Sequence, residues 1–141
     1  MRIQVDARQL HEERRYTEQQ AKKIVVSCKR RLRETSLATE RSIKQHGEMF
    51  SMPRDTGRAA ASWGHWAPGL LRADAKGASP GDAVWEEKDN GLTIVQGSNV
   101  PYIEDLNAGH SEQQSAGFLD RAEEHAMRLL DKYIDEIMGE F

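Results

Sequence analysis

Histidine is the residue type in this chain best suited to acid–base or metal chemistry. The chain holds five, which share no spacing typical of metal ligands: His11, His46, His65, His110 and His125. Two glutamates follow His11, but Arg15 stands where a zinc-protease helix would carry its second histidine. Cys28 is the single cysteine, which excludes an internal disulfide and a cysteine metal cluster. The sequence therefore predicts neither a metal site nor a cofactor.

Hydrolytic chemistry has little support in the sequence. Ser62 lies near His65, but no Gly-x-Ser-x-Gly frame surrounds it, and no carboxylates stand in a recognisable catalytic frame. One enzymatic hypothesis remains, a small hydrolase in which His110 acts with Glu104 or Ser111. It requires a pocket in which these groups converge. The prediction is that the chain is not an enzyme.

A run of basic residues raises the question of nucleic-acid binding. The run lies on one face of a predicted helix and comprises Lys22, Lys23, Lys29, Arg30, Arg31 and Arg33. Of these, Lys22, Lys29, Arg30 and Arg33 are the candidates for contacts with DNA phosphates or with a neighbouring subunit. Acidic residues on the same helix and a net charge of −3 argue against a dedicated nucleic-acid binder. A DNA-binding accessory protein stays an alternative, and a solvated helix face is the simpler interpretation.

The overall composition fits one small domain. The chain has 141 residues, of which 38% are hydrophobic and 30% charged, and we expect residues 17–141 to form the domain and residues 1–16 an N-terminal arm. No apolar run approaches the roughly 20 residues that cross a membrane. The first 15 residues lack the apolar centre of a signal peptide.

Two long helices are expected to frame the fold. The first begins after Thr17, which forms a capping box with Gln20, and continues to about Met49. Its apolar stripe weakens after Leu32. The second begins at Ser115 or Phe118, with Ser115 as a possible cap, and runs to Phe141. A short helix over 99–106 is expected between them, with Asn99 as its cap and Gly109 as its left-handed exit.

A small antiparallel sheet is expected between the helices. The segments 83–87 and 92–96 flank an Asn-Gly pair, which favours a hairpin because both residues accept positive φ. Residues 1–6 alternate apolar and polar side chains, as a short strand or an extended arm would. Trp63 and Trp66 are expected on or beside a third strand. The predicted class is therefore α+β, a small antiparallel sheet packed by the two helices.

Two segments together resemble a known family. The first is DTGRAAASW (55–63), and the second, about 40 residues later, is NVPYIEDLNAGHSEQQSAGF (99–118). With the order of elements around them, they resemble the tail-component family of long-tailed bacteriophages, whose members are called head–tail joining, neck or tail-completion proteins. The resemblance covers about residues 17–138. The matching residues are Thr56, Gly57, Arg58, Ser62, Tyr102, Leu106, Gly109, His110, Ser111, Gln113, Ala116, Gly117 and Phe118.

The resemblance implies a virion structural protein, found in the neck or tail of the particle and in the host cytoplasm during assembly. Its members commonly form six-fold rings, so the implied partners are copies of the chain itself, portal or connector proteins, and tail-tube or tail-terminator proteins. A tail-terminator ring is an alternative position. Genomic DNA in the channel is a further possible contact, and no membrane is implied. The segment 102–118 and the two tryptophans, Trp63 and Trp66, are the expected carriers of packing and interfaces.

Overall fold

A computed structural model describes residues 1–7, 17–54, 56–72 and 76–141 of the chain. Two long helices, two short ones and three strands make up the fold, together with two 3-10 turns, at 68–70 and 80–82. In chain order the helices and strands are β1 (Arg2–Asp6), α1 (Glu18–Lys44), α2 (Arg58–Ala61), β2 (Ala83–Lys88), β3 (Thr93–Ser98), α3 (Ile103–Asn107) and α4 (Phe118–Gly139).

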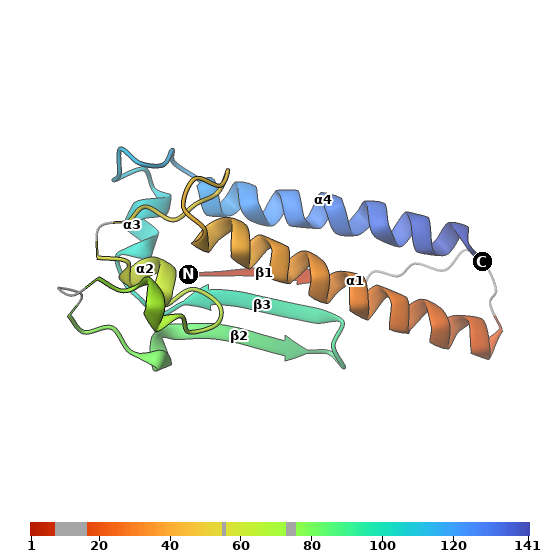
Figure 1. Ribbon diagram of the computed structural model, residues 1–141. Coiled ribbons are helices and arrows are strands. Elements are labelled where there is room, and N and C mark those ends of the chain that lie inside the picture. Colours follow the sequence, from red (N-terminus) through yellow and green to blue (C-terminus); the bar gives the residue numbers. More distant parts are fainter. Residues whose placement is uncertain (8–16, 55, 73–75) are drawn as a thin grey trace.

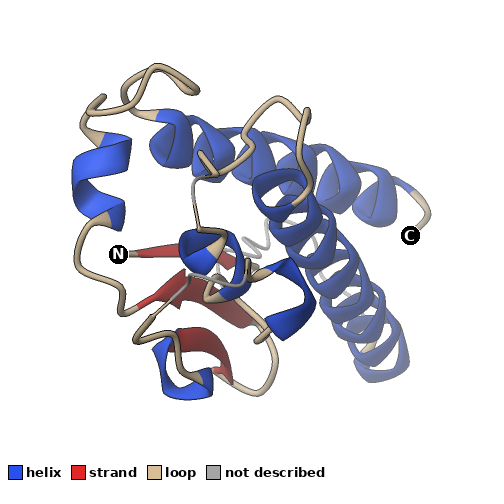
Figure 2. Cartoon of the chain, turned by 60° about the vertical axis from the view of Figure 1, so that its left-hand side comes forward, coloured by secondary structure: helices blue, strands red, loops and turns tan. Residues whose placement is uncertain are grey.

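The predicted α+β class is confirmed. The strands form an antiparallel sheet in the order β1-β3-β2, and α1 and α4 run antiparallel to each other beside it (Figure 1). β3 is buried along its whole length, because it is central in the sheet. The predicted hairpin is also confirmed, since Asp89, Asn90 and Gly91 all have positive φ between β2 and β3. α2 and α3 lie at one end of the two-layer body (Figure 2).

The third strand comes from the N-terminal segment and not from the tryptophan segment. β1 pairs with β3 in a register that places Ile3 opposite Gln96, and its side chains alternate between buried and partly exposed. The alternation in residues 1–6 therefore marks a strand, whereas the expected strand at Trp63 and Trp66 is wrong. Residues 8–16, the rest of the predicted arm, lie outside the described residues.

Trp63 lies beside the sheet and is fully buried. Its indole Nε1 donates to the side-chain oxygen of Gln96 at 2.8 Å, and the Gln96 amide donates to the carbonyl of Ser36 at 2.8 Å. Gln96 thus joins the segment after α2, the central strand and α1 through polar groups that water does not reach. The tryptophan serves packing within the chain.

α1 begins as predicted and ends earlier. The capping box is present, with Gln20 N donating to Thr17 Oγ1 at 3.2 Å and Thr17 N donating to Gln20 Oε1 at 3.0 Å. The helix ends at Lys44 and not near Met49, because the chain reverses at Gly47, where φ is +88°. Met52 N then donates to the carbonyl of Ile43 at 2.7 Å, which holds the reversed chain against the last turn.

Two hydrophobic clusters hold the layers together. The first joins the C-terminal end of α1 to α2, α3 and the start of α4, and it contains Ile43, Met52, Ala60, Trp63, Ile103, Phe118 and Leu119. The second joins the sheet to the other halves of α1 and α4, and it contains Val5, Ile24, Cys28, Leu32, Ile94, Ala126 and Leu130. The weaker stripe in the second half of α1 is explained by the buried polar residues Thr35, Ser36 and Thr39.

The caps of the last two helices differ from the prediction. Asn99 donates to the carbonyl of Gly81 and does not cap α3, which starts at Ile103 without a side-chain cap. Ser115 does not cap α4, whose N-cap is Gly117 with φ of +76°. The left-handed exit at Gly109 is confirmed, with φ of +97°. No helix in the described part of the chain is long and apolar enough to cross a membrane.

Candidate interaction site

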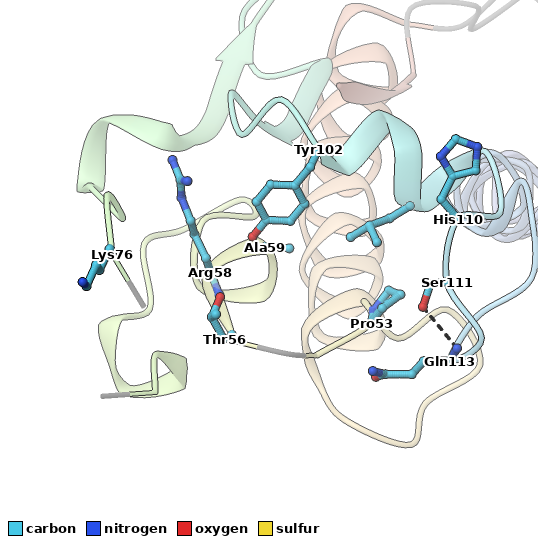
Figure 3. Close-up of a pocket in the computed structure, with 11 residues that line it drawn as sticks. Pro53, Thr56, Arg58, Ala59, Lys76, Tyr102, His110, Ser111 and Gln113 are labelled. Atoms are coloured by element: carbon cyan, nitrogen blue, oxygen red, sulfur yellow. Dashed lines mark hydrogen bonds between the residues drawn. The ribbon is translucent and has the colours of Figure 1, made fainter. Parts of the chain in front are cut away.

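Eight of the predicted site residues line a cleft of about 530 Å³. Two segments separated by about 40 residues in the sequence meet there, one around α2 and one around α3 (Figure 3). The cleft is lined by Pro53, Thr56, Gly57, Arg58, Ala59, Lys76, Tyr102, Leu106, His110, Ser111 and Gln113. Of the thirteen predicted interface residues, eight therefore line one cavity.

The Thr-Gly-Arg segment is a tight turn that starts α2. The Thr56 hydroxyl accepts a hydrogen bond from Arg58 N at 3.3 Å. Gly57 is the N-cap residue with φ of +78°, and a Cβ there would lie 2.0 Å from the carbonyl oxygen of Leu70. Both conditions require glycine, because an L side chain resists this φ and the backbone of Leu70 leaves no space. The turn places Arg58 in the lining of the cleft.

Arg58 connects three segments at the cleft. Its Nη2 lies 3.6 Å from Asp82 Oδ2, just before β2, and its guanidinium carbon lies 5.9 Å from the centre of the Tyr102 ring. The side chains of Arg58 and Asp82 are only 26% and 22% exposed, so their attraction is less screened than that of a surface pair. Planar guanidinium groups favour this combination of a carboxylate and an aromatic ring.

Two glutamines fix the loop that follows α3. Gln113 pairs with the backbone of Arg54 through both ends of its amide, accepting from Arg54 N at 2.8 Å and donating to Arg54 O at 3.0 Å. Gln114 donates to the carbonyls of Met49 and Ser51, each at 3.2 Å. Gln113 thus fixes the path of this loop through hydrogen bonds to the backbone.

Ser111 and His110 occupy the outer part of the same loop. The Ser111 hydroxyl accepts from Gln113 N at 3.1 Å, so it closes a local turn. His110 is 69% exposed, and its Nδ1 lies 3.9 Å from a carboxylate oxygen of Asp105, not of Glu104. In Figure 3 its imidazole is turned away from Arg58 and Tyr102. The described contacts thus give Ser111 a structural bond and leave His110 at the rim.

The entry into α4 is built by residues that the sequence analysis missed. Asn107 Oδ1 accepts from Leu119 N at 2.9 Å, and its carbonyl accepts from Gly117 N at 2.6 Å, so this residue of α3 caps α4. Arg121 binds back to the Ala116 carbonyl and the Ser115 hydroxyl. Asn107 lies ten residues before Gly117, and capping patterns cover only neighbouring positions. Asp82 and Gln114 were missed because their partners also lie far from them in the sequence.

The other predicted interface residues lie away from the cleft opening. Trp63 and Phe118 are fully buried in the first hydrophobic cluster, and Trp66 is partly buried. Gly109 lies close to Ala116, since a Cβ on Gly109 would be 3.0 Å from the Ala116 methyl group. This close approach of Gly109 and Ala116 is made within the chain.

Several of the basic residues on α1 are paired within the chain. Lys22 lies 3.6 Å from Glu18, Arg33 binds Glu87 on β2, and Arg31 binds Glu34 while stacking over a tyrosine ring of α4. Arg30 is exposed, and Lys29 passes close to Gly91 of the hairpin turn. Pairing with carboxylates lowers the net charge that this face presents to phosphates.

The described residues contain no group of three or more histidine, cysteine or acidic side chains that could hold a metal ion. The surface of the cleft carries two cations, Arg58 and Lys76, and the aromatic ring of Tyr102. Comparison of the chain with known protein families, with curated proteins and with solved structures finds no match.

Proposed function

We propose that this chain is a structural protein of the virion of a long-tailed bacteriophage, acting at the head–tail junction as a neck or tail-completion protein. Copies of the chain assemble as a ring that joins the connector to the tail. The observation that carries the proposal is the meeting of the Thr-Gly-Arg turn and the 102–113 segment in one surface cleft. These are the two segments on which the resemblance to the tail-component family depends, and in the fold they form one unit.

The way the cleft is built favours docking over turnover. Side chains that could react are instead used to fix the backbone, as Ser111 and Gln113 are. Arg58 is held by a carboxylate and an aromatic ring. A surface fixed in this way binds a partner with little loss of conformational freedom. Lys76 and His110 at its exposed rim are available for a partner's polar groups.

An open sheet edge supports assembly from identical copies. β2 pairs with β3 on one side only, so its other edge carries backbone donors and acceptors that a neighbouring chain can meet. The opposite edge strand, β1, is partly closed within the chain, because Gln4 N donates to the Glu123 carboxylate of α4 at 2.9 Å. Because the β2 edge is open and the β1 edge is partly occupied, a neighbouring copy would meet the β2 edge with a different surface. Such a contact between unlike surfaces can repeat from copy to copy.

Locating the chain in phage particles tests the proposal. Antibody-labelled particles of the phage that encodes it, viewed by negative-stain electron microscopy, are expected to carry label at the neck. The purified chain, alone or mixed with connector and tail proteins, is expected to give ring-shaped particles of matching solution mass. Label absent from purified particles, or turnover that is lost in a His110→Ala variant, would contradict it. Salt-sensitive binding to duplex DNA with no ring would favour the DNA-binding alternative.

A further inference from the structure

A second groove lies beside the C-terminal end of α1. It has a volume of about 640 Å³ and is lined by Leu37, Glu40, Arg41, Lys44, Gln45, His46, Arg54 and Leu70. We call it the basic groove, because three of its residues are lysine or arginine and one is histidine. Leu37 and Leu70 give it half-buried apolar walls. None of the basic residues predicted to meet DNA lies here.

The cations of the basic groove lack carboxylate partners among the described residues. Arg54 donates to the backbone carbonyl of Lys44, and Lys44 donates to the carbonyl of His65. The single acid, Glu40, already accepts from the backbone and the ring of His65 at 2.7 and 2.8 Å. Burial lowers the pKa of Lys44, and Glu40 opposes that shift only in part. Among the described residues, Glu40 is therefore the only acid in the lining to offset the charge of Arg41, Lys44 and Arg54.

The opposite end of the molecule carries the complementary charge. The last turns of α4 present four exposed acidic residues, which we call the acidic end: Asp131, Asp135, Glu136 and Glu140. Within the described part of the chain none of them forms an ion pair. Lys132 is the only basic residue beyond Asp131, so this segment has an excess of negative charge.

The two charged surfaces are too far apart to meet within one molecule. α1 and α4 are antiparallel, so the basic groove at the C-terminal end of α1 and the acidic end of α4 lie at opposite ends of the body (Figure 1). The 27 residues of α1 rise about 1.5 Å each, a length of roughly 40 Å. Electrostatic attraction in physiological salt decays over about 8 Å. The two surfaces therefore cannot meet within one molecule, but they can meet between two copies.

We propose that the basic groove of one copy binds the acidic end of a second copy, giving a head-to-tail contact between identical chains. Carboxylates of the incoming helix lie against Arg41 and Arg54, and its half-buried Met138 and Phe141 lie near the apolar walls. Because the two surfaces differ, the contact repeats from copy to copy and closes into a ring when the rotation per step allows it. Closure of the ring rests on the proposed function. The contact between two copies does not, and we expect it in the purified protein alone.

A protein partner fits the groove better than a nucleic acid. Leucine side chains form part of its lining, and phosphate groups make no favourable contact with apolar side chains. The groove's cations are few, and the chain as a whole is acidic, with a net charge of −3. A basic stripe along an element would be expected for phosphate tracking.

Charge reversal on both surfaces tests the contact. The full chain is studied by sedimentation velocity over a range of concentrations, in about 0.1 M and about 1 M salt, where the Debye length is about 10 Å and about 3 Å. The wild-type chain is expected to associate in low salt and to dissociate in high salt. Arg41→Glu with His46→Glu should raise the dissociation constant at least tenfold, and so should Asp135→Lys with Glu136→Lys. Lys23→Glu with Arg128→Glu, at exposed positions on α1 and α4 outside both charged surfaces, is the matched control and should leave it unchanged.

Mixing the two reversed variants separates a specific contact from misfolding. In an equimolar mixture every groove faces an end of opposite charge, so association is expected to return. A wild-type chain that stays monomeric at millimolar concentration in low salt, or variants that fail to associate on mixing, would overturn the inference. Loss of duplex DNA binding in the groove variant, with self-association intact, would also overturn it. Failure of the proposed function gives a different result, in which the contact persists but the chain is absent from phage particles.

Discussion

Replacing Gly57 by alanine tests whether the Thr-Gly-Arg turn is as close to its neighbours as the structure indicates. Gly57 has φ of +78°, and a Cβ would lie 2.0 Å from the oxygen and 3.0 Å from the carbon of the Leu70 carbonyl. A backbone carbonyl cannot turn aside as a flexible side chain can. Gly47 is a matched control, because its φ is +88° and nothing lies within 4 Å of the position that a Cβ would take there.

The two substitutions share one energetic cost and differ in the other. An L residue in the left-handed region costs about 1–2 kcal/mol, and this applies to both. Forcing a methyl group into a filled space adds about 1–3 kcal/mol, and this applies to Gly57→Ala alone. The loss of unfolded-state entropy is the same for both and cancels in the comparison. Gly57→Ala should therefore lower the free energy of unfolding by about 1–3 kcal/mol more than Gly47→Ala does.

Urea denaturation followed by tryptophan fluorescence measures both values, since Trp63 is fully buried in the folded state. Two variants whose unfolding free energies agree within about 0.5 kcal/mol would refute the reasoning, because that is the scatter expected between independent sites. The result would mean that Leu70 does not approach Gly57 as closely as described. Arg58 would then not be held at the cleft by this turn.

Three further changes probe the loop, the core and the single thiol. Gln113→Ala should lower the unfolding free energy by about 1 kcal/mol. It should also speed hydrogen exchange of the Arg54 amide, because that N–H loses its acceptor. An unchanged exchange rate at Arg54 would contradict the pairing. Gln96→Leu should lower the unfolding free energy by about 2–4 kcal/mol, because it leaves Trp63 Nε1 and the Ser36 carbonyl unpaired in the core. The same substitution should lower it by less in a Trp63→Phe background. Equal losses in both backgrounds would count against this hydrogen-bond network. Burial raises the pKa of the Cys28 thiol in the folded chain above its ordinary value of 9.0. As the pH rises above 9.0 the unfolded chain loses this proton first, so the free energy of unfolding should fall with rising pH. Cys28→Ala should remove this fall in urea titrations at a series of pH values, and an unaltered pH dependence would exclude the thiol as its source.

The sequence predicted local structure well because the relevant signals lie within a few residues of each other. Thr17 and Gln20 are one turn apart, and the Asn-Gly pair sits between its two strands. The end of α1 was placed too late, because nothing before Pro53 forbids a helix. The helix ends at Lys44 because the chain reverses at Gly47, and Met52 N then binds the carbonyl of Ile43 in the last turn.

Contacts between distant segments explain the remaining errors. The tryptophan segment has the aromatic composition of a strand, but the position beside β3 is taken by β1, whose own alternation is short. The sequence analysis named two segments as the candidate site, and their meeting at one cleft could not be read from spacing. The pairing of Arg33 in the basic run with Glu87, which lies on another element, could not be read from the sequence for the same reason.

The cleft residues divide into those that build it and those that are free to contact a partner. Gly57, Arg58 and Gln113 hold backbone or neighbouring side chains, so substitutions there alter the fold and any binding together. Lys76 and His110 are exposed and have few contacts in the described chain. If the cleft docks a partner, changes at these two residues should weaken assembly while leaving the unfolding free energy within about 0.5 kcal/mol of wild type, as surface substitutions generally do. Loss of assembly through the first group alone would instead mean that the cleft is only the scaffold of some other contact surface.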